Sequence, residues 1–273
     1  MKASTKIHLY FARFVWNPLP GGLQKTVSRL CALFYRTRVS RFLIKPFCQR
    51  YSIGDSDLAR YRPASGLNRY RSFQDFFTRK LVQSTPLGLG PVWPCQGYVC
   101  DFGRVGDVGA VLVKGHLATV PRIFDCSNGV IPADYFFVNI FLHNHHYHRL
   151  HAPVSGVISE VHAVPGQLTF LRPWLYSKSQ ISEPSFRNER IIVRIDDEQS
   201  RPWFLSFVGG MGVGQIRMSS DIKIGAEVSC GQEMAVFLLG STCCMAIPDS
   251  VNGLTYMKPI EVGHQLNERN LHE

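Results

Sequence analysis

The sequence lacks a long apolar run. No segment approaches the roughly 18 uncharged apolar residues of a membrane-spanning helix, and the N-terminus lacks a compact apolar stretch followed by a small-residue cleavage site. We therefore expect neither a spanning helix nor an export signal. Internal repeats and low-complexity segments are also absent. The eight cysteines form no CxxC pair, so we expect free thiols in a reducing compartment and no disulfide framework.

Acidic residues are scarce in the first 80 positions. Sixteen Lys and Arg residues stand there against only Asp55, Asp57 and Asp75, whereas the rest of the chain holds 14 basic and 17 acidic residues. The net charge of +10 therefore comes entirely from the N-terminal third. Such a local excess of positive charge indicates an anionic partner, either nucleic acid or anionic lipid.

The apolar residues between these charges favour lipid over nucleic acid. In residues 23–47, Leu23, Val27, Leu30 and Phe34 recur at steps of four, three and four, with basic residues between them. This spacing predicts one or two basic amphipathic helices, a pattern typical of helices that lie in a membrane interface. The alternative is that the apolar stripe packs on the protein's own core.

Glycine and proline divide the chain into a basic, helical region (1–84) and a β-rich body (85–273). Pro46, Pro63 and the segment 84–94 mark loops, the last of them at the expected boundary. Short β-branched or aromatic runs then predict strands at 135–142, 191–195, 203–208 and 234–239, and Cys243 and Cys244 sit in another strand-like run. The predicted fold class is α+β, with a mainly antiparallel sheet.

Five histidines crowd into nine positions in HNHHYHRLH (143–151). Neither an HExxH motif nor a nearby carboxylate accompanies them, so we expect no metal site. General acid–base catalysis needs only one or two histidines beside a reacting group. The simplest alternative is that most of these histidines occupy a loop and have no role.

Several motifs in order resemble one known family. YHRLHAPVSG (147–156) and, much later, FLLGST (237–242) are similar to segments of the phosphatidylserine decarboxylase family. Five further segments follow the family order: SFQDFFTRKL (72–81), VKGH (113–116), VPGQLTF (164–170), FRNER (186–190) and VGGMGVGQI (208–216). A GST tripeptide alone would indicate an ordinary turn. The glycines of the last segment fit either close approach to a ligand or a tight β corner.

The resemblance implies a self-processing, pyruvoyl-dependent enzyme. Ser241 would attack the carbonyl of Gly240, elimination would separate residues 1–240 from 241–273, and Ser241 would become the pyruvoyl cofactor. Glycine offers an unhindered carbonyl and backbone freedom, and serine needs a base to take its proton. The family pattern gives that role to His151 and a role in decarboxylation to His148. His143, His145 and His146 are then incidental.

One position departs from the family pattern. Where the family has a Pro-x-Asp-Gly element whose Asp orients the histidine, this chain has WPCQG, with Gln96 in place of the acid. A glutamine accepts a hydrogen bond from a histidine ring but carries no charge to stabilise an imidazolium. Asp101, five residues later, is an alternative orienting group. The chain also has His146 where the family usually has Asp before Tyr147.

Substrate contacts and partners follow from the same resemblance. Lys114, Arg187 and Arg190 are candidates to bind the lipid phosphate or carboxylate, since arginine binds such groups bidentately; the alternative is that the arginines pair with Glu189, Asp196 or Asp197. We expect a peripheral protein on the cytoplasmic face of a bacterial membrane, bound to anionic phospholipid and not to nucleic acid. Its two cleavage chains would form a heterodimer, with higher homo-oligomers open.

Three functions remain on sequence grounds. The first is decarboxylation of phosphatidylserine to phosphatidylethanolamine. The second is an unprocessed family member that binds anionic lipid without catalysis, suggested by Gln96 and His146. The third is a processed decarboxylase that acts on a different amine-bearing acid.

Overall fold

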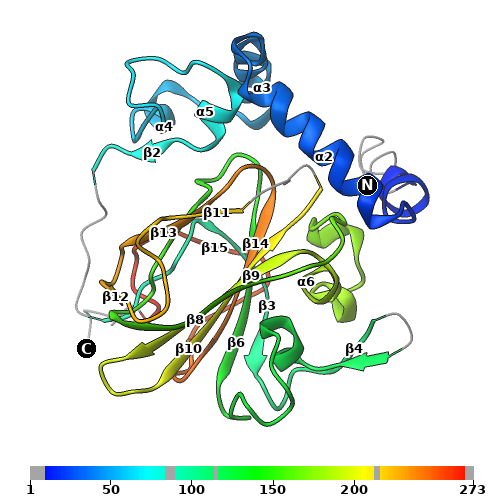
Figure 1. The fold of residues 1–273 in the computed structure, drawn as a ribbon, viewed down its shortest axis with the longest axis vertical. Coiled ribbons are helices and arrows are strands. Elements are labelled where there is room, and N and C mark those ends of the chain that lie inside the picture. The colour runs from blue at the N-terminus through cyan, green and yellow to red at the C-terminus, as the bar shows by residue number, and fades with distance from the viewer. Residues whose placement is uncertain (1–9, 84–89, 114–115, 212–215, 268–273) are drawn as a thin grey trace.

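The computed structural model describes residues 10–83, 90–113, 116–211 and 216–267, and has the predicted α+β fold. The N-terminal helices gather at one end of the molecule, above a body of antiparallel strands (Figure 1). They are η1 (Phe11–Trp16), α2 (Gly21–Arg36), η2 (Arg38–Leu43), α3 (Ile44–Tyr51), α4 (Asp55–Leu58) and α5 (Phe73–Phe77). A two-stranded sheet of β1 (Tyr61–Arg62) and β2 (Lys80–Leu81) joins the α4 and α5 segments.

The body is built on an eight-stranded sheet whose described neighbours pair antiparallel, in the order β12-β8-β9-β10-β14-β6-β3-β15. Its strands are β3 (Gly97–Arg104), β6 (Phe136–Leu142), β8 (Gly156–Val164), β9 (Arg190–Asp197), β10 (Pro202–Gly209), β12 (Glu227–Val228), β14 (Ser241–Ile247) and β15 (Lys258–Ile260). The strands predicted at 135–142, 191–195 and 203–208 are confirmed as β6, β9 and β10. Strand β14 lies at the centre, where Ser241 is opposite Gly209 on β10 and Leu142 on β6.

A second sheet packs on one face of the first. It consists of β7 (Arg149–His151), β11 (Ile216–Met218) and β13 (Glu233–Phe237), and β13 confirms the strand predicted at 234–239. Side chains alternate along β14: Cys243 enters the core between the two sheets, and Cys244 enters a second core on the other face. Because both faces are covered, all seven residues of β14 are buried and read as one apolar run.

Smaller elements cover that second face. They are β4 (Val111–Val113), β5 (His116–Ala118), η3 (Val120–Phe124), η4 (Pro173–Leu175), η5 (Lys178–Gln180) and α6 (Glu183–Arg187). All eight cysteines are free thiols in the structure, as expected.

Helix α2 turns small and polar residues toward the body. Its buried side chains are Gln24, Ser28 and Ala32, one face at steps of four residues. Gln24 accepts a hydrogen bond from the backbone N–H of Leu168 (2.9 Å) and donates one to the carbonyl of Trp16 (3.0 Å). The helix therefore docks largely through hydrogen bonds rather than through its large apolar residues.

The large apolar residues of α2 and η2 are exposed instead. Leu30 is 61% and Leu33 58% exposed on α2, and Phe42 on η2 is 69% exposed. Only Val27 of the predicted stripe packs inward, against the small cluster around Trp16. The alternative that this stripe packs on the protein's own core is therefore wrong for most of its members. Among the described residues, no helix is both long and apolar enough to cross a bilayer.

One loop prediction is wrong. Pro46 lies in the first turn of α3 and not in a loop. The first turn tolerates proline because its N–H groups have no acceptor within the helix, so the missing donor costs nothing there.

Candidate active site

Ser241 begins the central strand β14, directly after Gly240. Its side chain is fully buried, and its Oγ has no hydrogen-bond partner among the described residues. Gly240 itself is not forced by its backbone, because its φ lies outside the left-handed region and an added Cβ would meet only Asn144 Oδ1, at 3.5 Å. The backbone conformation therefore does not require glycine here, and the unhindered carbonyl remains the reason for its place.

Gly210, at the end of β10, lies against that carbonyl. A Cβ on Gly210 would stand 2.7 Å from Leu171 Cδ1 and 3.3 Å from the carbonyl oxygen of Gly240. Only glycine leaves room for the chain to pass this close to the Gly240–Ser241 bond. Of the two alternatives for these glycines, close approach describes Gly210; Gly212 and Gly214 lie outside the described residues.

A cavity of about 350 Å³ opens beside this bond. Its wall combines elements far apart in the sequence, with aromatic and aliphatic side chains predominating: Phe11, Cys31, Tyr35, Phe141, Asn144, Phe170, Leu171, Arg172, Gly210, Met211, Leu239, Gly240 and Ser241. Residues of η1 and α2 thus form one side of it and the sheet the other. The cavity can hold an amphiphilic ligand and keep water from its apolar side.

His148 lies next to the segment that leads into Gly240. Its carbonyl accepts the N–H of Phe237 (2.9 Å), and its ring packs on Phe77 with centroids 4.0 Å apart. Nδ1 bonds the carbonyl of His146 (2.8 Å), so the proton sits on Nδ1, while the buried Nε2 has no partner among the described residues. Burial holds the pKa of His148 well below its usual value. The ring is therefore neutral, with a free lone pair.

His151 lies in a different place from Ser241. Its Nδ1 donates to the carbonyl of Gly231 (2.7 Å) and its Nε2 is 3.0 Å from the hydroxyl of Tyr147, so both nitrogens are engaged. Burial lowers its pKa as well. Its side chain lines a separate cavity of about 310 Å³ with Arg62, Lys80 and Glu233, and Ser241 does not line that cavity. His151 therefore lies at a different cavity from Gly240 and Ser241, and the structure does not place its ring beside them.

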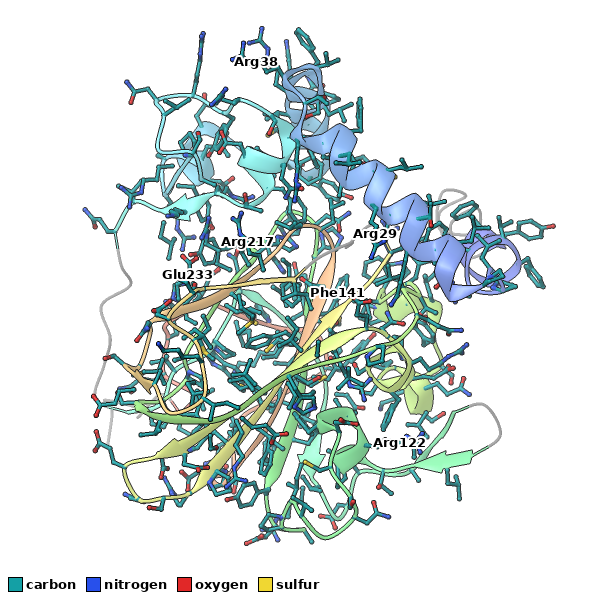
Figure 2. All side chains as sticks on the ribbon, in the orientation of Figure 1. Arg29, Arg38, Arg122, Phe141, Arg217 and Glu233 are labelled. Atoms are coloured by element: carbon teal, nitrogen blue, oxygen red, sulfur yellow. The ribbon has the colours of Figure 1, made fainter. Side chains whose placement is uncertain are left out.

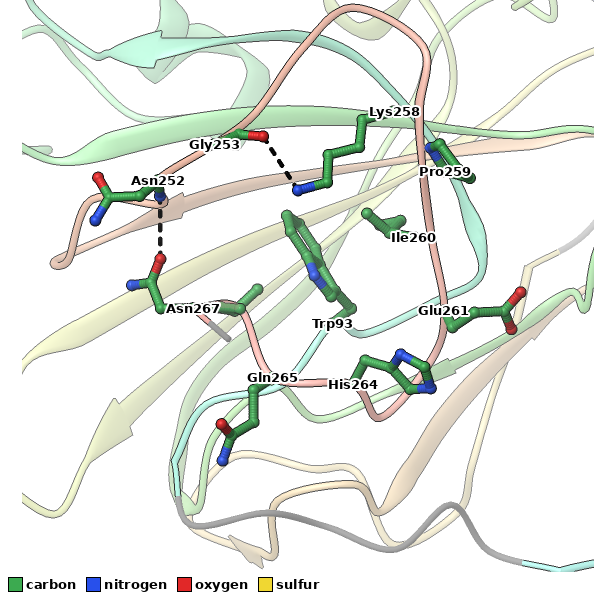
Figure 3. Close-up of a pocket in the computed structure, with 11 residues that line it drawn as sticks. Trp93, Asn252, Gly253, Lys258, Pro259, Ile260, Glu261, His264, Gln265 and Asn267 are labelled. Atoms are coloured by element: carbon green, nitrogen blue, oxygen red, sulfur yellow. Dashed lines mark hydrogen bonds between the residues drawn. The ribbon is translucent and has the colours of Figure 1, made fainter. Parts of the chain in front are cut away.

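Gln96 connects to His151 only through Tyr147. Its Oε1 accepts the backbone N–H of Tyr147 (2.7 Å), and its Nε2 donates to the carboxylate of Glu261 (2.8 Å). The expected bond from Gln96 to a histidine ring is not present. Glu261 lies at the edge of another cavity, of about 410 Å³, and its side chain points away from the Trp93 ring in that cavity (Figure 3).

Asp101 does not take over the orienting role. A register shift between Val99 and Asp101 interrupts the pairing of β3 with β6, and the Asp101 carboxylate accepts a hydrogen bond from Ser182 (2.6 Å). Burial raises the pKa of Asp101. Its partner is thus a hydroxyl on the far side of the sheet from β7, so the alternative of Asp101 as the orienting group is wrong in this arrangement.

The arginines predicted to bind substrate have structural partners instead. Arg187 pairs with Glu183 (2.7 Å) and also donates to Gln167. Arg190 is buried and donates to the carbonyls of Ile123 and Arg122. Arg122 and Arg190 line another cavity, and Arg122 lies apart from Phe141, which lines the Ser241 cavity (Figure 2). Neither Arg187 nor Arg190 lines the Ser241 cavity, and their partners differ from the acids anticipated. Lys114 lies outside the described residues.

The other three histidines form a compact turn. His143 donates its backbone N–H to Nδ1 of His146 (3.1 Å), and the rings of His143 and His145 are joined through their Nδ1 atoms (2.7 Å). Burial lowers the pKa of all three, that of His143 to about 4. No group of three His, Cys, Asp or Glu side chains in the described part of the chain is arranged to hold a metal ion.

Sequence reasoning missed two residues of the cavity. Asn144, between those histidines, lies beside Gly240 and donates to the hydroxyl of Tyr51 (3.3 Å). Arg172 lies in the same wall, although it belongs to no motif. The only sequence signal for Arg172 is its position two residues after the VPGQLTF motif (164–170).

Comparisons with known proteins agree with the motifs. The family model described as phosphatidylserine decarboxylase matches residues 73–267. A protein of Chromobacterium violaceum named phosphatidylserine decarboxylase proenzyme is 30% identical over 233 residues, which cover 75% of this chain and 78% of that protein. Proteins with the same name from Psychrobacter cryohalolentis and Brevibacillus brevis are 27% and 26% identical, over 82% and 89% of this chain and 86% and 91% of theirs.

Proposed function

The chain belongs to the phosphatidylserine decarboxylase family of carboxy-lyases, and we propose that it cleaves itself between Gly240 and Ser241 and then converts phosphatidylserine to phosphatidylethanolamine. The observation that carries the proposal is the Ser241 hydroxyl, buried without a partner, directly after Gly240 and at the wall of an apolar cavity. A buried polar group without a partner is costly, and such costs concentrate where chemistry needs the atom free.

Self-cleavage rearranges one peptide bond. Ser241 Oγ attacks the Gly240 carbonyl carbon, and the peptide nitrogen leaves as the amine of Ser241, which gives an ester. Loss of the Ser241 Cα proton and of the ester carboxylate then yields residues 1–240 and a dehydroalanine at position 241. This dehydroalanine is an enamine that tautomerises to an imine, and hydrolysis of the imine releases ammonia and leaves a pyruvoyl group. The close packing of Gly210 on the Gly240 carbonyl supports a fixed geometry for the attack.

Two histidines can serve the proton transfers. We assign the base of self-cleavage to His151 and proton delivery during decarboxylation to His148, as the family pattern implies. His148 is neutral with its proton on Nδ1, and its Nε2 is free to accept a proton and return it. The assignment of His151 rests on the family pattern, because its ring lines a cavity that Ser241 does not line and its Nε2 is already bonded by Tyr147. The two residues must approach each other before Nε2 can accept a proton from Ser241.

Variants of the two histidines test these roles. His151→Ala is expected to stay a single chain, and His148→Ala to be cleaved but to lose decarboxylation by about 10²- to 10⁴-fold. Cleavage is followed by intact mass and decarboxylation by release of carbon dioxide. If His148→Ala stays a single chain while His151→Ala is cleaved, the base of self-cleavage is His148, whose Nε2 has no partner among the described residues.

The pyruvoyl group, when present, supplies an electron-withdrawing carbonyl that accepts the electrons left behind as carbon dioxide departs. This chain's residues fit that group, because position 241 faces the cavity and no described side chain bonds the Ser241 hydroxyl. Phe141, Phe170 and Leu239 exclude water from the apolar wall and so favour loss of a charged carboxylate as a neutral gas.

We propose that the two cleavage chains remain together. The shorter chain would begin with β14, which pairs residue by residue with β10 and with β6 from Ser241 onward. Both partner strands belong to the longer chain. After cleavage, the two chains should therefore co-elute in native size exclusion and separate only in denaturant.

We also propose that α2 and η2 lie in the surface of an anionic membrane. Their outer faces carry exposed Leu30, Leu33 and Phe42, with Arg29 and Arg38 near them. Apolar side chains that enter the acyl region and cations that meet lipid phosphates are the usual basis of interfacial binding. The same helix α2 lines the Ser241 cavity with Cys31 and Tyr35, so a membrane on its outer face would lie next to the cavity.

Intact-mass spectrometry of the purified protein, beside Ser241→Ala, tests the proposal. We expect two chains that meet at 240 and 241, with the shorter one lighter by the change of serine to pyruvoyl, and a single chain from the variant. A wild-type protein that remains one chain and still binds anionic vesicles would instead favour the lipid-binding, unprocessed alternative, to which Gln96 points.

A further inference from the structure

Arg172 is a cation without an anionic partner in the wall of the Ser241 cavity. No carboxylate in the described part of the chain lies within ion-pair distance of it, and no hydrogen bond from its guanidinium to a described residue is found. Its charge rests over aromatic rings instead, 6.0 Å from the centroid of Phe170 and 5.9 Å from that of Trp174. These contacts hold the guanidinium in place and leave its N–H donors for a ligand.

In these surroundings the charged form of Arg172 costs free energy, and a bound anion would offset that cost. Burial lowers the pKa of Arg172; Tyr51 raises it in part, and the neighbouring charge of Arg50 lowers it again. The cation in turn lowers the pKa of His143, so that ring stays neutral. The described part of the chain therefore offers donors and positive charge here but no counter-ion. Half-buried arginines normally pair with carboxylates or phosphates, to which their planar fork is matched.

We propose that Arg172 binds the phosphodiester of the substrate headgroup, on the premise that the proposed decarboxylation of phosphatidylserine is correct. The cavity places it in the same wall as Gly240 and Ser241. The phosphodiester links the serine headgroup, which must reach position 241, to the acyl chains, which lead back to the membrane. Arg172 thus replaces Arg187 and Arg190 as the anion-binding residue, since those two are committed to internal partners.

Phosphatidylserine also carries a carboxylate, and the chemistry argues against that group as the partner. The carboxylate loses its charge in the reaction, so a guanidinium bound to it would stabilise the substrate more than the transition state and slow the reaction. The phosphodiester keeps its charge in substrate, transition state and product. Binding it is uniform along the reaction, which lowers KM and leaves kcat unchanged.

Steady-state kinetics of Arg172→Gln on phosphatidylserine in mixed micelles test the proposal. We expect KM to rise about 10- to 100-fold, the range of a charge-assisted hydrogen bond, with kcat within about threefold of wild type. Arg172→Lys should recover part of the loss, because it keeps the charge but not the fork. Arg122→Gln removes the same charge at another cavity, which Ser241 does not line, and should leave both constants unchanged. A fall in kcat at unchanged KM, or no change in either constant, would overturn the proposal.

Two further measurements separate folding and function from binding. The cleavage pattern seen by intact mass and the melting temperature of Arg172→Gln should match the wild type, since the side chain has no ion pair with a described residue. If the wild type proves not to decarboxylate, binding of phosphatidylmethanol in neutral detergent micelles, a lipid with a phosphodiester but no amine or carboxylate, still tests the site. Wild type should bind it at least about tenfold more tightly than Arg172→Gln; equal binding would reject the site itself.

Discussion

At the scale of single residues, several buried polar atoms have no hydrogen-bond partner among the described residues. Ser241 Oγ and His148 Nε2 are buried without partners among the described residues, but so is Ser206 Oγ in the middle of β10. An unpaired hydroxyl is therefore not sufficient to identify a nucleophile. Ser241 differs from Ser206 because it follows Gly240, faces a cavity, and has Gly210 packed on the carbonyl it would attack.

Gly210→Ala tests that packing. The new Cβ would meet Leu171 at 2.7 Å and the Gly240 carbonyl at 3.3 Å, so either the side chain or the peptide bond must move. We expect self-cleavage to slow by about tenfold or more and stability to fall by about 1–3 kcal/mol. Gly22→Ala, where a Cβ meets nothing within 4 Å, is the control and should leave the rate of self-cleavage unchanged. Normal cleavage by Gly210→Ala on a time course of intact mass would contradict this role.

Gln96→Asp, the change that restores the usual family residue, should not simply repair the site. It replaces the amide that donates to Glu261 with a second carboxylate near it, on a side chain one methylene group shorter, and so removes the hydrogen bond. Two like charges this near each other raise one carboxyl pKa and destabilise the fold at neutral pH, and protonation relieves the repulsion toward pH 5 and below. We expect a lower melting temperature at pH 7, by about 2–6 °C, and recovery in Gln96→Asp/Glu261→Gln. An unchanged melting temperature would show that the two side chains separate freely.

Helix α2 is unusual at the scale of elements because it shows its large apolar residues to the outside. Its inner face is held by Gln24, Ser28 and Ala32, and Lys25 pairs with Glu189 on the body (2.7 Å). An exposed apolar face of this kind, next to cations, is a binding surface in most soluble folds. The helix forms one wall of the Ser241 cavity, and we propose that its outer face contacts a membrane.

The double variant Leu30→Lys/Leu33→Lys separates the membrane contact from the cavity wall. Both side chains are more than half exposed, so folding should change by less than about 0.5 kcal/mol. Loss of two inserted side chains should weaken binding to vesicles of phosphatidylcholine and phosphatidylglycerol by at least about tenfold in sedimentation. Val130→Lys adds the same charge at an exposed apolar site on the body and should bind as wild type. Undiminished binding by the double variant would place the membrane contact elsewhere.

Five of the ten histidines of the whole molecule lie in residues 143–151, a largely buried region, and they set how its stability depends on pH. His146 and His148 are almost fully buried, and burial lowers the pKa of each. Because their folded pKa lies below the unfolded value of about 6.5, the unfolded chain binds more protons as pH falls below that value. The free energy of unfolding must therefore decrease with falling pH.

Between pH 7 and pH 5 each of these two histidines should cost about 2 kcal/mol of stability, measured by urea unfolding at the two pH values. Depressed carboxyl groups such as Asp197 lose their contribution only below pH 4, outside this window. His146→Asn keeps an acceptor for the backbone N–H of His143 and should reduce the dependence by the share of one buried histidine, about 2 kcal/mol. The same slope in this variant would assign the effect to other groups.

The sequence by itself determined the α+β class, the central strands and the family, because apolar runs and ordered motifs are local signals. The cleavage bond that we propose also comes from a motif. The sequence also determined the basic character of the front. Which face of α2 points outward was decided by tertiary structure, since Gln24 can be buried only where Trp16 and Leu168 supply backbone partners.

The tertiary structure alone decided the partners of the site residues. Gln96 and Glu261 meet across 165 positions, and Asp101 faces Ser182 because of an irregularity in strand pairing. Nothing local in the sequence distinguishes Arg190 from Arg172. In the structure Arg190 donates to backbone carbonyls, whereas Arg172 contacts aromatic rings. Such differences depend on contacts between distant segments, which no local pattern of residues encodes.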